Sequence, residues 1–98
     1  MKMILAVYNV AVHDEILQAV MKAGVHCYTT WPRVIGRGKR TGPRLDTTVW
    51  PGANSVTMMV VSDEIAPRVM DALAELRATL GATEGIKAFQ LPVERQLD

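Results

Sequence analysis

The chain has 98 residues, of which 49% are hydrophobic, and it carries 11 basic against 10 acidic side chains. This length suits a single domain spanning residues 1–98, and the near-zero net charge argues against a general nucleic-acid-binding protein. No apolar run approaches the roughly 20 residues that cross a bilayer. The single cysteine, Cys27, excludes an internal disulfide framework, so we expect a protein of the reducing cytoplasm.

The first half of the chain predicts a strand, a helix and a second strand. Residues 2–8 are short and rich in β-forming residues, as a buried strand is. Residues 12–23 carry an apolar stripe at helical spacing, and Gly24 stops this helix. Residues 25–35 are again β-biased, but Pro32 requires an edge strand or a bulge there.

The second half repeats the order of strand, helix and strand. Residues 55–61 form a clear strand, and Ser62 or Asp63 can cap the helix that follows it. That helix, 65–80, has apolar residues at steps of four, four, three and four, which is the strongest helical signal of the chain. The last strand is predicted at 86–91.

This βαββαβ order predicts an α+β, ferredoxin-like sandwich, in which a four-stranded antiparallel sheet carries two helices on one face. The other face of the sheet then needs cover, because a soluble monomer rarely exposes so large an apolar patch. Val7, Met58, Val60 and Phe89 could belong to either face. We therefore predict a closed oligomer that packs sheet against sheet, a homotrimer.

Basic charge is concentrated in one stretch that is rich in glycine and proline. Residues 33–52 carry a net charge of about +4, and they can continue neither a helix nor a central strand. Within them, 36–42 reads Gly-Arg-Gly-Lys-Arg-Thr-Gly, where glycine amides can form an anion-binding nest and Arg37, Lys39 and Arg40 supply donors for phosphate. The alternative is a flexible, solvated hairpin whose basic residues serve solubility.

Several other chemistries find little support in the sequence. His26 and Cys27 are consecutive and would point to opposite sides of a strand, so we assign no metal site. The third predicted strand lacks the aromatic residues of an RNA-recognition module, and no spacing suggests a nucleophilic triad. His13, near a helix start, is expected to be a solvated surface residue. We therefore expect no catalytic residue and no enzyme.

Spaced segments along the chain resemble PII-like signalling proteins of the nitrogen regulatory P-II superfamily. The segments are Met1-Lys2, Gly24-Val25, Val34 to Gly42, Val60 to Glu64 and Gly85 to Phe89. The resemblance covers residues 1–91, and the glycine-rich basic segment is its most specific part. It implies a non-enzymatic homotrimer that binds an adenine nucleotide (ATP, ADP or AMP) in the clefts between subunits.

The resemblance also implies roles for particular residues. It places nine at the nucleotide: Val7, Thr29, Gly36, Arg37, Gly38, Lys39, Val60, Gly85 and Lys87. Residues 37–54 would be the family's T-loop, a flexible loop that docks onto a target protein such as a membrane transporter or a metabolic enzyme. Arg40, Arg44 and Trp50 would contact that partner.

The chain departs from the family pattern at several positions. Residues 37–54 contain no tyrosine to be modified, and Arg40 replaces the glutamine typical of 2-oxoglutarate sensing. After the last strand only Arg95 is available for a terminal phosphate, so a mono- or diphosphate is as plausible a ligand as a triphosphate. The alternative family is a CutA-like trimer with a metal-tolerance or structural role, suggested by Leu91-Pro92-Val93, and a small enzyme on the same fold is a third reading.

Overall fold

The computed structural model describes the whole chain except residues 39–41, 45–52 and 82–83. Its main elements are β1 (Lys2–Asn9), α1 (His13–Lys22), β2 (Thr29–Val34), β5 (Asn54–Val61), α2 (Ile65–Leu80) and β6 (Lys87–Pro92). A 3-10 turn, η1 (Val10–Val12), precedes α1, and two short strands, β3 (Gly36–Gly38) and β4 (Gly42–Arg44), form a separate hairpin. The predicted βαββαβ order is confirmed, with the hairpin as an addition.

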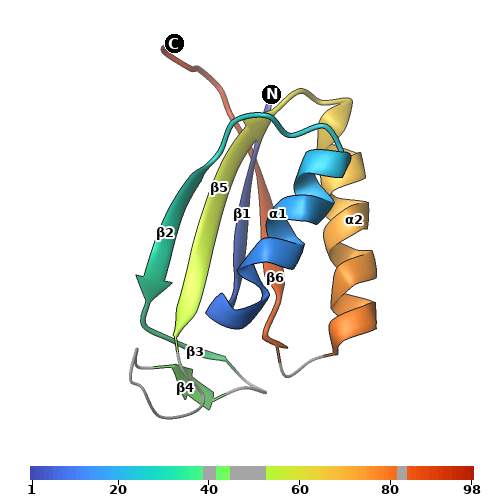
Figure 1. The fold of residues 1–98 in the computed structure, drawn as a ribbon. Helices are drawn as coiled ribbons and strands as arrows, with labels where there is room; N and C mark the ends of the chain where they lie inside the picture. The colour runs from blue at the N-terminus through green and yellow to red at the C-terminus, as the bar shows by residue number, and fades with distance from the viewer. Residues whose placement is uncertain (39–41, 45–52, 82–83) are drawn as a thin grey trace.

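The four long strands form one antiparallel sheet in the order β2-β5-β1-β6, and both helices cover the same face of it (Figure 1). The predicted ferredoxin-like sandwich is therefore correct. β2 is an edge strand, and its register with β5 shifts between Trp31 and Val34, as Pro32 requires. The Ser55 hydroxyl donates a hydrogen bond of 2.6 Å to the Pro32 carbonyl, which satisfies the backbone at the irregularity.

Alternation along the strands separates a covered face from an open one. On β1, Ile4, Ala6 and Tyr8 point toward the helices and are completely buried. They pack with buried apolar residues of both helices and of the neighbouring strands, among them Ile16, Val20, Met59, Val69 and Leu73. The hydrophobic core thus lies entirely between the helices and one face of the sheet.

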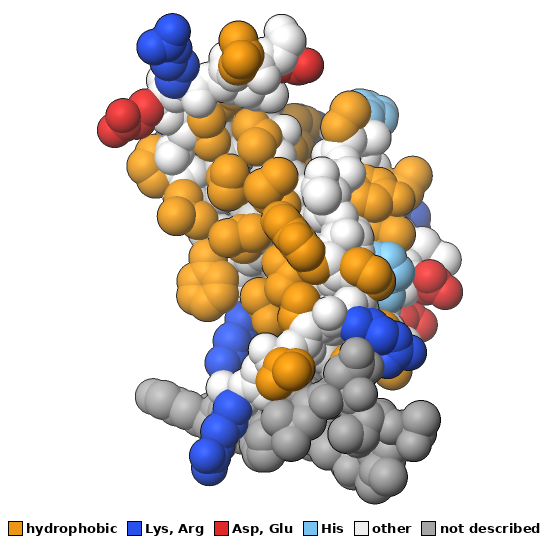
Figure 2. All heavy atoms as spheres, turned by 90° about the vertical axis from the view of Figure 1, so that its left-hand side faces the viewer, with side chains coloured by type: hydrophobic (Ala, Val, Ile, Leu, Met, Phe, Trp, Pro, Cys, Tyr) orange, Lys and Arg blue, Asp and Glu red, His pale blue; other side chains and the backbone are white. Residues whose placement is uncertain are grey.

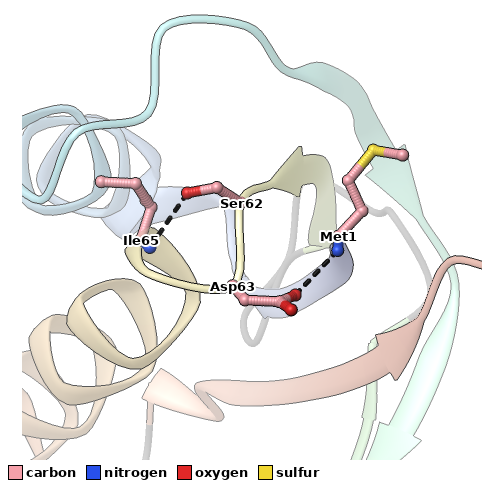
Figure 3. A network of polar contacts seen from close by, with 4 residues as sticks. All are labelled: Met1, Ser62, Asp63 and Ile65. Atoms are coloured by element: carbon pink, nitrogen blue, oxygen red, sulfur yellow. Dashed lines mark hydrogen bonds and ion pairs between the residues drawn. The ribbon is translucent and has the colours of Figure 1, made fainter.

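The two helices are held against the sheet by tight junctions at their ends. α1 ends where Gly24 adopts a φ of +114°, and a Cβ there would lie 2.8 Å from Cδ1 of Ile65. At the start of α2, the Ile65 amide donates to the Ser62 hydroxyl (3.3 Å), so Ser62 is the capping residue (Figure 3). Asp63 instead pairs with the amine of Met1 at 2.7 Å, and this hydrogen bond lowers the pKa of its carboxyl.

The open face of the sheet is mostly hydrophobic. Cross-strand pairing groups its residues in rows: Val60, Met3 and Leu91; then Thr29, Met58, Leu5 and Phe89; then Trp31, Val56, Val7 and Lys87. Figure 2 shows these hydrophobic side chains gathered over the face, with Lys and Arg side chains near its lower end. The four residues that the sequence left unassigned, Val7, Met58, Val60 and Phe89, all lie here.

Two expectations from the sequence need correction. His13 is half-buried, not a solvated surface residue, because its ring stacks on Tyr8 and accepts or donates a 2.6 Å hydrogen bond there. The second strand begins at Thr29, four residues later than predicted, since 25–28 serve as the connection from α1.

Candidate functional site: a basic hollow at one end of the open face

A hollow of about 230 Å³ lies where the open face of the sheet meets the first residues of the β3–β4 hairpin. Its lining comes from four separate parts of the chain: Val7, Gly36, Arg37, Asn54, Gly85, Lys87 and Phe89. The register of the sheet explains this convergence, because Val7 pairs with Lys87 on one side and with Val56 on the other. Most of the hollow's lining thus comes from the ends of strands that the sheet register brings together.

Glycines at two positions shape the entrance to the hollow. A Cβ on Gly36 would lie 3.0 Å from Nδ2 of Asn54, so a larger residue would displace the amide that lines the site. Gly85 has a φ of +65°, a left-handed conformation that side chains other than glycine adopt at a cost. This turn brings the chain into β6 and sets Lys87 at the hollow.

The charge of the hollow is positive. Arg37 and Lys87 both line it and are exposed, while no acidic side chain occurs among the described residues of its lining. Two cations beside apolar walls formed by Val7 and Phe89 suit a ligand that has both an anionic part and a flat or apolar part. A phosphate with an attached aromatic base has this chemistry.

Asn54 is a site residue that the sequence analysis missed. Its Oδ1 atom is buried without a hydrogen-bond partner, as is Nδ2 of its cross-strand neighbour Asn9. Asn9 uses its own Oδ1 to accept from the Ala11 amide at 3.1 Å. Nothing in the sequence marks this position, because β5 also carries the polar residues Ser55 and Thr57. Phe89 was likewise not assigned to the site.

The structure brings together five of the nine residues expected at a nucleotide: Val7, Gly36, Arg37, Gly85 and Lys87. Thr29 and Val60 do not line the hollow; both lie further along the open face, in rows with Met58 and Met3. The backbone of Gly38 belongs to β3, and that of Arg44 to β4. Lys39, Arg40 and Trp50 lie outside the described residues.

A chain of hydrogen bonds occupies the covered face opposite the hollow. The Tyr8 hydroxyl contacts Nδ1 of His13 at 2.6 Å and the Thr57 hydroxyl at 2.7 Å, and Thr57 contacts Thr30 at 2.9 Å. Burial raises the pKa of Tyr8 above its usual range. These contacts join β1, β5 and β2 beneath the helices, so they fix the strands whose other face carries the hollow.

Neither membrane-spanning helices nor metal clusters occur in the described part of the chain. None of its helices is long and apolar enough to cross a bilayer. No group of three or more His, Cys, Asp or Glu side chains is placed to hold a metal ion among the residues that the structure describes.

The structure is a ferredoxin-like sandwich with a basic hollow at one end of its open sheet face, a form suited to an anionic ligand. The chain belongs to the family described as Nitrogen regulatory protein P-II, whose pattern matches residues 1–96. Proteins of this family are nucleotide-binding signalling proteins and non-enzymatic regulators. The family membership predicted from the spaced segments is confirmed, and the CutA-like alternative is not supported.

Individual proteins are similar to this chain in sequence or in fold. The chain is 32% identical over 95 residues to the nitrogen fixation nifHD region glnB-like protein 1 of Methanococcus maripaludis, covering 96% of this chain and 89% of the relative. In structure it resembles CPII of Thiomonas intermedia, which was solved with ADP, AMP and bicarbonate. The TM-score is 0.75 at 16% identity, and the match covers 96% of this chain and 88% of CPII. A PII-like signalling protein of Thermus thermophilus gives a TM-score of 0.69 at 21% identity, covering 92% of this chain and 83% of that chain.

Proposed function

We propose that this chain is a cytoplasmic regulator that binds an adenine nucleotide at the basic hollow and reports its presence to a target protein through residues 37–54. The observation that carries the proposal is the hollow itself, which places Arg37, Lys87 and two glycines, Gly36 and Gly85, around one volume. Glycine lets the backbone approach a phosphate closely, and the two cations provide charge-assisted hydrogen bonds.

The nucleotide site is completed by a second subunit. Val60, expected near the adenine, lies two rows of the open face away from Val7. Thr29, expected there too, lies on the edge strand β2, which β5 and β1 separate from Lys87 on β6. Val60 is six residues along β5 from Asn54, a separation of about 20 Å in an extended strand. Thr29 and Val60 do not line the hollow of their own chain, so we assign them to the hollow of a neighbouring chain. The hydrophobic open face supplies the surface for such a trimer.

The target is contacted through the loop that begins at the hollow. Arg37 lines the hollow and opens the segment 37–54, so a ligand there touches the base of the loop directly. A ligand shifts the loop only if it binds one loop arrangement better than another. The target, a membrane transporter or a metabolic enzyme, would read this arrangement through Arg40, Arg44 and Trp50.

Calorimetry with AMP, ADP and ATP tests the ligand. Because the CPII structure contains bicarbonate with ADP, each titration is run with and without bicarbonate. Lys87→Ala should weaken nucleotide binding by about 10-fold or more, since a charge-assisted hydrogen bond contributes about 1.5–3 kcal/mol. Lys22→Ala, which removes an exposed lysine from α1, is the matched control and should leave affinity unchanged.

Two results would contradict the proposal. If no adenine nucleotide binds to the assembled wild-type protein, the hollow serves another ligand or none. If Lys22→Ala and Lys87→Ala reduce affinity equally, binding is a general response to positive charge and does not occur at the hollow.

A further inference from the structure

The segment after β6 leaves the body of the molecule without packing against it. The Val93 amide donates to the Met1 carbonyl at 3.2 Å, and beyond this bond residues 94–98 are all exposed. The side chain of Leu97 is fully exposed, with a relative accessibility of 103%. In Figure 1 this tail runs on past the end of β6, away from the helices. The described contacts thus leave Leu97 without an apolar neighbour.

A second pocket, of about 330 Å³, lies on the other side of β6, between that strand and α2. It is lined by Met70, Leu73, Ala74, Arg77, Ile86, Lys87, Ala88 and Phe89. Six of these residues are apolar, and the two polar ones are cations. Because β6 is an edge strand, the pocket opens at the side of the molecule that a neighbouring subunit can approach.

The tail and this pocket are complementary in chemistry. In the tail, an apolar side chain, Leu97, is followed directly by a carboxylate, Asp98. The lining of the pocket combines six apolar residues with two cations, Arg77 and Lys87. Opposite charges arranged in this way select a partner and its orientation. We propose that residues 93–98 of one copy dock in the pocket between α2 and β6 of a neighbouring copy, with Leu97 inside and Asp98 at the cations.

The chain cannot easily fill its own pocket. β6 ends beside Lys2, whereas the pocket surrounds the first residues of the strand, Lys87 to Phe89. The tail continues in the direction of β6, so it would have to reverse completely to reach them. In a ring of identical subunits each surface meets a different surface of the next copy, which suits a tail that leaves one end and a pocket at the edge. This inference rests on the assembly proposed above.

Lys87 links the tail to the ligand. It lines both the pocket for the tail and the basic hollow, so Asp98 of a neighbour and a phosphate would share one cation. By linkage, any change that the nucleotide makes in the affinity for the tail is matched by an equal change that the tail makes in the affinity for the nucleotide. The tail is therefore placed to tune ligand binding.

Disulfide trapping tests the docking directly. In a Cys27→Ser background, the pair Ala74→Cys and Leu97→Cys should give chain-to-chain disulfides on mild oxidation, seen as linked species on a non-reducing gel. Disulfides form only when the two Cα atoms approach within about 7 Å. The matched control pairs Ala74→Cys with Gln96→Cys, because neighbouring residues of an extended segment point to opposite sides. We expect at least several-fold more linkage at 97 than at 96.

A charge exchange gives an independent readout. Arg77→Glu should reduce trapping between positions 74 and 97, and adding Asp98→Arg should restore it. Equal linkage at 96 and 97, disulfides formed only within single chains, or no rescue by the charge exchange would each overturn the docking.

The two proposals can fail separately. Analytical ultracentrifugation and ADP titration are run on Leu97→Ser, which leaves the hollow intact. If this protein assembles and binds ADP while the chain carrying Ala74→Cys and Leu97→Cys never crosslinks, the docking of the tail is wrong and the nucleotide site stands. If the wild-type chain binds no ADP and the chain carrying Ala74→Cys and Leu97→Cys still crosslinks, the proposed function is wrong and the docking stands.

Discussion

The covered and the open face of the sheet are built from the same strands but differ in how completely one chain satisfies them. The covered face has helices over it, a buried core and the Tyr8 hydrogen-bond chain. The open face is also mostly hydrophobic, yet Trp31 and Phe89 remain 46% and 53% exposed. Stability therefore comes from the first face, and we infer that assembly and ligand binding come from the second.

A charge in the middle of the open face should have the largest effect on assembly. Met58 lies in the row between Thr29 and Leu5, so Met58→Glu would put a carboxylate into the proposed interface at a high desolvation cost. Sedimentation should show the mass of one chain where the wild type shows three. Ala78→Glu, on the exposed side of α2, is the control and should leave the mass unchanged. If the Met58→Glu protein sediments like the wild type, the interface between subunits does not lie on the open face.

Neighbouring residues on β1 can separate the two faces. Ile4 is completely buried beneath the helices, so Ile4→Ala should lower the free energy of unfolding by about 2–5 kcal/mol at every protein concentration. Leu5 points to the open face, and the cost of Leu5→Ala should depend on protein concentration, because in the proposed trimer another chain packs on that face. Urea unfolding of each variant at two protein concentrations, about 100-fold apart, measures both changes in the free energy of unfolding. If both variants lose the same free energy of unfolding at every protein concentration, Leu5 does not lie in an interface between chains and the distinction between the two faces is wrong.

The hydrogen-bond chain should contribute less than the core. Tyr8→Phe keeps the ring but leaves the buried Thr57 hydroxyl without one partner, at a cost of about 1–3 kcal/mol. Because burial raises the pKa of Tyr8, the folded state favours the protonated phenol. The stability from this group is present below the unfolded pKa of about 10 and is lost as pH rises through the folded value. Tyr8→Phe should therefore remove the loss of stability at alkaline pH. If denaturant titrations show the same fall in the free energy of unfolding at high pH in both proteins, this role of Tyr8 is wrong.

Asp63 should give the smallest effect, because its ion pair with Met1 is exposed. The amine lowers the pKa of this carboxyl, so its contribution is present above the unfolded pKa of about 4 and is lost as pH falls through the folded value. Asp63→Asn should therefore slightly flatten the fall in melting temperature below pH 5, about one unit above that value. Thermal melts from pH 3 to pH 7 measure it, and a large change at pH 7 would show that the pair is more than a surface contact.

The fold could be predicted from local patterns alone. The spacing of apolar residues predicted both helices and all four long strands, and Pro32 predicted the irregular register of the edge strand β2. These signals could be used because they depend on residues close in sequence. The partner of His13 could not be predicted, because Tyr8 reaches it only after β1 and α1 have packed. The same holds for the short hairpin, whose glycines read as irregular loop.

The site could be predicted only in part. Gly36, Arg37, Gly85 and Lys87 stand in segments with a recognisable pattern, and the structure brings them together. Asn54 was missed, because a single asparagine at a strand start has no distinguishing sequence signal. The separation of Val60 from the hollow emerged only from the sheet register. Because Val60 does not reach the hollow of its own chain, we assign it to a site shared with a second subunit.

Mixing two binding-deficient variants tests the shared site most directly. Lys87→Ala weakens the basic half of the site, and Val60→Ala, which keeps the open face apolar for assembly, weakens the half that we assign to the neighbour. If each site is shared, random mixed trimers regain one intact site in about a quarter of their clefts, because one chain supplies Lys87 and the next supplies Val60. Calorimetry with ADP on the refolded mixture should then recover about a quarter of the wild-type sites at wild-type affinity. If the mixture binds no better than the two variants measured apart, the nucleotide site is not shared between subunits and the account is wrong.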